Sequence, residues 1–134
     1  MLLSVDMQSE TPIYVQIRNQ IIEGIASGEL IPGDTLPSVR QMASDLGINL
    51  HTVNKVYALL KQEGFLVVHR KSGVIVNNYN EFKITEGFLE KLDNDLRSIV
   101  AEAICRGLTK DKFLEKCLGI YENFINSKTG GKKS

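Results

Sequence analysis

The chain has 134 residues, with sixteen basic and sixteen acidic side chains, and its formal net charge of zero argues against a generally polycationic binder. Its length suits one compact domain, or a small domain with an appendage, and is enough for a core without metals or disulfides. No apolar run approaches the roughly 18 residues of a membrane span, and the first residues lack a signal-peptide pattern. The chain has only two cysteines, far apart in the sequence, which favours a location in the reducing cytoplasm.

The charges are not evenly spread. Residues 1–35 carry one basic and five acidic side chains, residues 36–78 carry five basic and two acidic ones, and residues 79–134 carry ten and nine. Positive charge therefore gathers in the middle segment, as a DNA-facing edge requires.

The first helix is expected after a short, weakly ordered arm at residues 1–10. Thr11 is the predicted N-cap and Pro12 the first helical residue, where its missing N–H costs nothing. An isoleucine stripe follows with helical spacing, and Gly28 ends it. Residues 30–34 then form a turn, and residues 35–37 an extended approach to the next helix.

Two short helices joined by a tight turn are predicted between residues 38 and 64. Ser38 with Gln41 makes a capping box, and Gly47 stops the first helix in a left-handed C-cap. Asn49 caps the second helix, and Gly64 ends it. The buried faces are expected to be Val39, Met42, Ala43 and Leu46 in the first helix and Val53, Val56, Tyr57 and Leu60 in the second.

The outward side of the second helix is polar in its first turns, where it carries His51, Thr52, Asn54 and Lys55. A recognition helix reads base edges with its N-terminal residues, so these short hydrogen-bonding groups stand where DNA reading needs them. The alternative is an ordinary solvated helix face in a plain helical bundle.

A β-hairpin follows directly. Residues 65–70 and 74–77 are rich in β-formers and flank the turn Lys71-Ser72-Gly73. A helix-turn-helix followed by a hairpin is a winged helix, with His69, Arg70, Lys71 and Ser72 at the wing tip for phosphate or minor-groove contact. The alternative is a solvated turn with ordinary charges.

Beyond a polar hinge at residues 77–81 the pattern is purely helical. Gly107 ends one helix, Thr109 caps the last one, and the Gly/Lys-rich residues 127–134 are expected to be disordered. The two apolar stripes are too wide to bury each other, which favours a homodimer, with folding back onto the winged helix as the alternative. The predicted dimerisation residues are Phe82, Leu89, Leu92, Leu96, Ile99, Val100, Ala103, Phe113, Cys117, Tyr121 and Phe124.

Over residues 11–76 the sequence strongly resembles the GntR family of bacterial transcription regulators. The matching segments are residues 12–17, 28–34, 36–40, 46–49, 52–57 and 60–64, in family order and with family spacing. The short two-helix tail is similar to the YtrA-type subfamily, since the other subfamilies carry a much larger C-terminal domain.

The resemblance implies DNA-contact roles for Arg40 in the second helix, for Asn49, His51, Thr52 and Asn54 in the recognition helix, and for Arg70 and Gly73 in the wing. Two positions depart from the family. Leu50 stands where several relatives have a polar residue, which leaves an apolar contact such as a thymine methyl. Lys71 stands where many members have glycine, so the resemblance does not determine the backbone path of the wing.

The sequence therefore predicts a mostly α-helical fold with a small β-hairpin: an arm at 1–10, a winged helix-turn-helix at 11–77, a dimerisation tail at 78–126 and a disordered end at 127–134. The predicted function is a cytoplasmic, homodimeric transcriptional regulator that represses from a palindromic operator, without cofactor or enzymatic activity. The YtrA-type resemblance implies control of an ABC-transporter operon, and a small-molecule effector is not identifiable. The predicted DNA-binding set is Ser38, Arg40, Asn49, Leu50, His51, Thr52, Asn54, Lys55, Arg70, Lys71 and Gly73.

Two alternatives remain open. Cys105 and Cys117 lie on consecutive tail helices and could form a redox switch or, with histidine, a metal site, although isolated cysteines on apolar faces are usually core residues. A winged helix that serves only as a protein-interaction adaptor would show no salt-dependent DNA binding.

Overall fold

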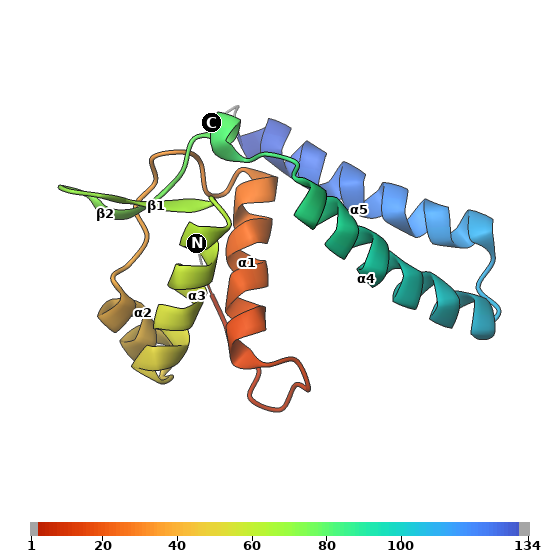
Figure 1. The fold of residues 1–134 in the computed structure, drawn as a ribbon, viewed down its shortest axis with the longest axis horizontal. Coiled ribbons are helices and arrows are strands. Elements are labelled where there is room, and N and C mark those ends of the chain that lie inside the picture. Colours follow the sequence, from red (N-terminus) through yellow and green to blue (C-terminus); the bar gives the residue numbers. More distant parts are fainter. Residues whose placement is uncertain (1–2, 132–134) are drawn as a thin grey trace.

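The structure is a computed structural model that describes residues 3–131. Three helices and a hairpin make one half of the molecule, from which two long antiparallel helices project (Figure 1). This is the predicted mostly α-helical winged helix with a tail. No helix in the described part of the chain is long and apolar enough to cross a membrane. The elements are α1 (Ile13–Ser27), α2 (Val39–Leu46), α3 (Leu50–Gln62), β1 (Leu66–His69), β2 (Gly73–Val76), the 3-10 turn η1 (Tyr79–Glu81), α4 (Glu86–Cys105) and α5 (Lys110–Gly131).

The core lies where α1, α2 and α3 meet the hairpin. Each helix contributes one apolar face, because side chains three and four residues apart project from the same side. The loop after α1 and the hairpin close the remaining gaps with their own apolar side chains. The buried residues are Ile17, Ile21, Ile25, Leu30, Leu36, Met42, Ala43, Val53, Val56, Tyr57, Leu60, Leu66 and Val76.

Local caps fix the helix-turn-helix. The Ser38 hydroxyl accepts the backbone N–H of Gln41 at 3.1 Å, and the Asn49 side chain accepts the N–H of His51 at 2.8 Å. Gly47 has a φ of 66°, which glycine adopts without a Cβ clash. The other half of the expected capping box is wrong, because the Gln41 side chain donates to Asp45 at 2.6 Å instead of accepting the backbone N–H of Ser38.

The extended approach to α2 pairs with the hairpin as a third strand-like segment. The Leu36 N–H donates to Val74 O, and the Val76 N–H donates to Asp34 O, both at 2.9 Å. A turn with Gly33 at a φ of 91° directs this segment onto β2. The pairing anchors the base of the wing to the loop that leads into the helix-turn-helix.

The expected start of α1 is wrong by one residue. The helix begins at Ile13, and Pro12 occupies the N-cap position without a side-chain hydrogen bond. The arm before it is also held more firmly than expected. The Gln20 amide exchanges two hydrogen bonds with the backbone of Ser4, and the Gln16 amide does the same with Asp6.

The hinge between the two halves is aromatic, and Phe82 belongs to it rather than to a tail helix. The Phe82 ring lies 5.1 Å from the ring of Phe65 and 5.9 Å from that of Tyr79. The next helix starts only at Glu86, after Thr85, whose hydroxyl accepts the N–H of Phe88 at 3.0 Å. The predicted heptad seam therefore does not extend back to Phe82, because this side chain packs against the winged-helix core.

The last helix returns to the first one. Phe124 of α5 lines a crevice with Gln20, Gly24 and Ser27 of α1, and α5 packs along α1 (Figure 1). The folding-back alternative is thus correct for the end of α5. Thr109 caps α5 as predicted, through the N–H of Lys112 at 3.2 Å. The helix runs to Gly131, so the expected disorder is wrong for residues 127–131. The rest of that prediction, residues 132–134, lies outside the described residues.

Tyr57 links the recognition helix to the start of α2. Its side chain is buried, and its hydroxyl donates a 2.6 Å hydrogen bond to the backbone carbonyl of Pro37. Burial raises the pKa of the Tyr57 phenol, because the phenolate would lose its hydration. This bond fixes α3 relative to the residue that precedes the N-cap of α2.

We expect Tyr57→Phe to lower the free energy of unfolding at pH 7 by about 1–2 kcal/mol, because the Pro37 carbonyl loses its buried donor. Above pH about 10 the unfolded phenol ionises while the folded one stays neutral, so wild-type stability falls as pH rises. The difference in free energy of unfolding between the wild type and Tyr57→Phe should therefore be smaller at pH 10.5 than at pH 7, as measured by urea unfolding. Tyr121→Phe, at an exposed tyrosine, is the control. If Tyr57→Phe lowers the free energy of unfolding equally at both pH values, the expected effect of Tyr57 ionisation on stability is contradicted.

Candidate nucleic-acid interface

The recognition helix presents the predicted polar side chains on the face opposite its buried one. His51, Asn54 and Lys55 are exposed, and Thr52 is half-buried. Leu50 is also half-buried and packs against the core, so only part of this side chain is available for a thymine methyl. The first two turns of α3 thus offer hydrogen-bonding groups at a protein surface, as reading in a major groove requires.

Helix α2 adds two further predicted residues beside this face. Arg40 is exposed in the first turn of α2, and no ion pair engages it within the described residues. Ser38 is exposed as well, but its hydroxyl already accepts the Gln41 N–H. Arg40 is therefore a solvent-exposed cation beside the polar face of α3, whereas Ser38 acts as a helix cap.

The wing follows the predicted hairpin with a three-residue turn. His69 of β1 pairs with Gly73 of β2, so Arg70, Lys71 and Ser72 form the tip. Gly73, the first residue of β2, has a φ of 79°, a left-handed conformation that glycine adopts without a Cβ clash. Arg70 and Lys71 are exposed, and the wing thus carries two cations at the end of a two-stranded arm.

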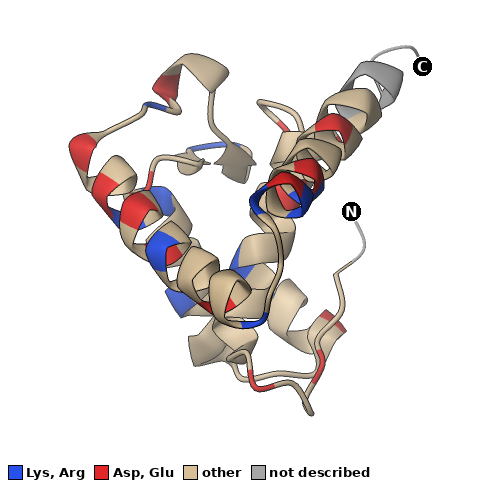
Figure 2. Cartoon of the chain, turned by 90° about the vertical axis from the view of Figure 1, so that its right-hand side faces the viewer, with Lys and Arg blue, Asp and Glu red and all other residues tan. Residues whose placement is uncertain are grey.

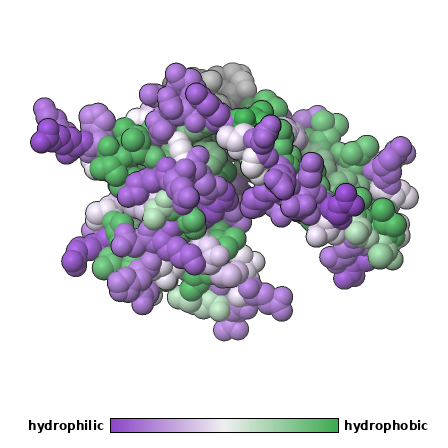
Figure 3. Space-filling view, viewed as in Figure 1, coloured by the Kyte–Doolittle hydropathy of each residue, from purple (hydrophilic) through white to green (hydrophobic). Residues whose placement is uncertain are grey.

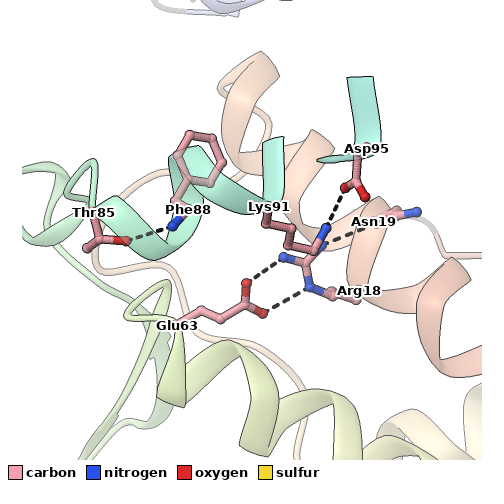
Figure 4. A network of polar contacts seen from close by, with 7 residues as sticks. All are labelled: Arg18, Asn19, Glu63, Thr85, Phe88, Lys91 and Asp95. Carbon is pink, nitrogen blue, oxygen red and sulfur yellow. Dashed lines mark hydrogen bonds and ion pairs between the residues drawn. The ribbon is translucent and has the colours of Figure 1, made fainter. Parts of the chain in front are cut away.

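Two contacts of α1 with α3 were not foreseen. The Arg18 guanidinium binds Glu63 through two hydrogen bonds, one of 2.9 Å from Nε, at the far end of the recognition helix (Figure 4). Hydrogen bonding to this carboxylate raises the pKa of Arg18 above its ordinary value. In the second turn of α3, the Lys55 ammonium lies 3.9 Å from the centroid of the Tyr14 ring, a cation–π contact worth about 0.5–1 kcal/mol at an exposed site. Helix α1 therefore contacts α3 both in its second turn and at its C-terminal end.

Beside the Arg18–Glu63 pair, the first turns of α4 close a cleft of about 580 Å³. Lys91 and Asp95 form an ion pair of 2.7 Å along α4, and the Phe88 ring stands next to them (Figure 4). The cleft marks the junction between the winged helix and the tail.

The tail exposes a continuous set of apolar side chains. Figure 3 shows apolar residues at the surface of the projecting helices, and Figure 2 shows basic and acidic residues of both signs mixed along them. Exposed apolar surface of this kind is typical of interaction sites. The exposed residues are Phe88, Leu89, Leu92, Leu96, Ile99, Val100 and Ile104 in α4 and Leu114, Leu118, Ile120, Tyr121 and Ile125 in α5. Of the other predicted dimerisation residues, Ala103, Phe113, Cys117 and Phe124 are half-buried.

The two cysteines are separate free thiols. Cys105 is exposed at the end of α4, and Cys117 is half-buried in α5. Within residues 3–131 no group of three or more His, Cys, Asp and Glu side chains is arranged to hold a metal ion.

Comparisons with known proteins agree with this geometry. The family model "Bacterial regulatory proteins, gntR family" matches residues 13–76, from the start of α1 to the end of the wing. The HTH-type transcriptional repressor YtrA of Bacillus subtilis is 32% identical over 114 residues, which cover 85% of this chain and 88% of the relative. The similarity thus includes the helical tail.

Solved structures show the same arrangement. A transcriptional antiterminator from Listeria monocytogenes shares the fold over 93% of both chains, with a TM-score of 0.85 and 22% identity. YtrA from Sulfolobus acidocaldarius, a GntR-family transcription factor, is 45% identical, covers 78% of this chain and 99% of its own, and has a TM-score of 0.59. The DNA-binding domain of AraR in complex with operator ORX1 covers 57% of this chain and 98% of its own, at 25% identity and a TM-score of 0.50.

The winged helix, the short tail and these relatives all indicate one assignment. The chain belongs to the GntR family, with a tail of the YtrA type, and is a DNA-binding transcriptional regulator rather than an enzyme.

Proposed function

We propose that this regulator is a homodimeric repressor that binds a palindromic operator, with one recognition helix in the major groove of each half-site. The observation that carries the proposal is that the chain combines an exposed polar face on α3 with a solvent-exposed apolar stripe on α4. A two-fold dimer presents two identical reading faces, and DNA that matches both has two-fold symmetry as well.

The reading set that we propose has distinct roles. His51, Thr52 and Asn54 read base edges from the first turns of α3, while Arg40 and the wing cations Arg70 and Lys71 bind phosphates or the minor groove. Asn49 and Ser38 mainly order the helix starts, through the caps already described. The half-sites would lie about one helical turn, roughly 10 base pairs, apart or further.

Repression is supported by the relative of Bacillus subtilis, which is named a repressor and matches over most of both chains. Control of an ABC-transporter operon is a further part of the proposal and depends on the YtrA-type resemblance alone.

Fluorescence-anisotropy titration tests the proposal, with the DNA upstream of the chain's own gene against a scrambled duplex of equal length. We expect tighter binding to the native fragment, two protomers for each site and a steep fall in affinity as salt rises, because phosphate contacts release counterions. Asn54→Ala should weaken binding to the native fragment alone by roughly tenfold or more, since a base contact contributes about 1–3 kcal/mol. Equal binding of the wild-type protein to both duplexes, without salt dependence, would contradict the proposal and favour the adaptor alternative.

A further inference from the structure

The contact of Lys55 with Tyr14 separates this lysine from the other polar residues of α3. Its ammonium lies 3.9 Å from the centroid of the Tyr14 ring, which belongs to the first turn of α1. Tyr14 is half-buried and packs against the core, so the core fixes the ring while its face takes the cation. The ammonium is thus held at the seam between α1 and α3.

The charge at this seam is available to an anion. Lys55 is exposed, and within the described residues no carboxylate lies within ion-pair distance of it. Arg18, the basic side chain of α1, is by contrast already neutralised, because its guanidinium donates two hydrogen bonds to the Glu63 carboxylate. An aromatic face attracts the cation but leaves its other N–H groups free to donate.

A lysine held at a seam suits a DNA phosphate better than a base edge. Lysine binds phosphate as a point charge, and such contacts fix the register of a protein on the duplex without reading sequence. Base reading requires a side chain that is free to enter the groove, and Asn54, at the neighbouring position of the same helix, is exposed. The contact with α1 draws Lys55 away from that role.

We propose that Lys55 binds a phosphate of the DNA backbone and that Tyr14 is its positioning residue, so that α1 forms one edge of the DNA interface. The inference rests on the proposed function, since it assigns the role of one residue within that interface. It also revises the expectation that Lys55 reads bases together with His51, Thr52 and Asn54.

Anisotropy titrations of Lys55→Met on the native fragment and on scrambled DNA, across a salt series, test the phosphate contact. We expect the affinity to fall by roughly three- to tenfold on both duplexes, and the slope of log K against log salt to become shallower by about 0.9. Asn54→Ala is the matched control from the same turn and should change the ratio between the two duplexes. A loss confined to the native fragment, or an unchanged slope, would overturn the assignment.

A double-mutant cycle tests the positioning role. Tyr14→Phe keeps the ring and should bind DNA as the wild type does, whereas Tyr14→Leu should weaken binding to both duplexes. Lys55→Met should then cost clearly less affinity in the Tyr14→Leu background than in the wild type. Additive losses would overturn the role of Tyr14, and thermal melts of each variant exclude unfolding as the cause.

These readouts separate the two proposals. A phosphate contact acts on any duplex, so the slope can be measured even when the native fragment is not preferred. In that case the operator proposal fails and the Lys55 assignment is still decided by the slope on scrambled DNA.

Discussion

Leu96→Glu should convert the regulator into a monomer and lower its affinity for operator DNA by at least about 100-fold, because two linked reading heads gain roughly 10²–10⁴ in avidity. Leu96 lies in the middle of α4, on the apolar stripe that also contains Leu92 and Val100, and each of these side chains remains 38% exposed in the single chain. In the proposed dimer this stripe is covered by the second copy. A carboxylate there would be buried without a partner, which costs several kcal/mol.

Sedimentation equilibrium and anisotropy titration together check this expectation. Asn94→Glu is the matched control, because it adds the same charge to the same helix about 200° away from Leu96 by the helical repeat. The control should stay dimeric and bind DNA normally. A Leu96→Glu protein that remains dimeric with wild-type affinity would show that α4 is not the dimer surface.

Leu60→Ala should lower the free energy of unfolding by about 2–5 kcal/mol, a large share of the 5–15 kcal/mol typical of a domain. Leu60 is fully buried in the last part of α3, in the cluster that joins α3 to α1 and the hairpin. The loss combines the transfer energy of the removed methyl groups with the cavity that they leave. Because α3 carries both the reading face and one wall of the core, this substitution should reduce DNA binding only near the melting temperature, where part of the protein is unfolded.

Urea unfolding and thermal melts measure this effect, with an expected drop in melting temperature on the order of 10 °C. Leu59→Ala is the matched control from the adjacent position, where the side chain is half-buried, and should cost only about 1 kcal/mol. Operator affinity measured well below the melting temperature should be close to that of the wild type for both variants. Equal destabilisation by the two substitutions would contradict the view that α3 faces the core through Leu60.

The sequence by itself determined most element types and their ends, because those depend on neighbours a few residues apart. The cap at Ser38, the left-handed Gly47 and the cap at Asn49 follow from local chemistry and are confirmed. The same holds for the core face of each helix, which the helical spacing predicts, and for the placement of the hairpin turn around Gly73. The exposed polar face of α3 is the complement of its buried face, so it could be predicted as well.

Only the tertiary structure decided what lies between segments that are distant in sequence. The second pairing partner of β2, the position of Phe82 on the winged-helix core, and the return of α5 to α1 depend on chain folding that no local pattern encodes. The Arg18–Glu63 fork joins residues 45 positions apart, and the Lys55–Tyr14 contact likewise joins α3 to α1. Hydrophobic periodicity identifies which side of a helix is buried but not which helix covers it, since burial of apolar area is non-directional. The contact between α1 and the recognition helix, on which the proposed role of Lys55 depends, therefore becomes visible only when the helices are placed against one another.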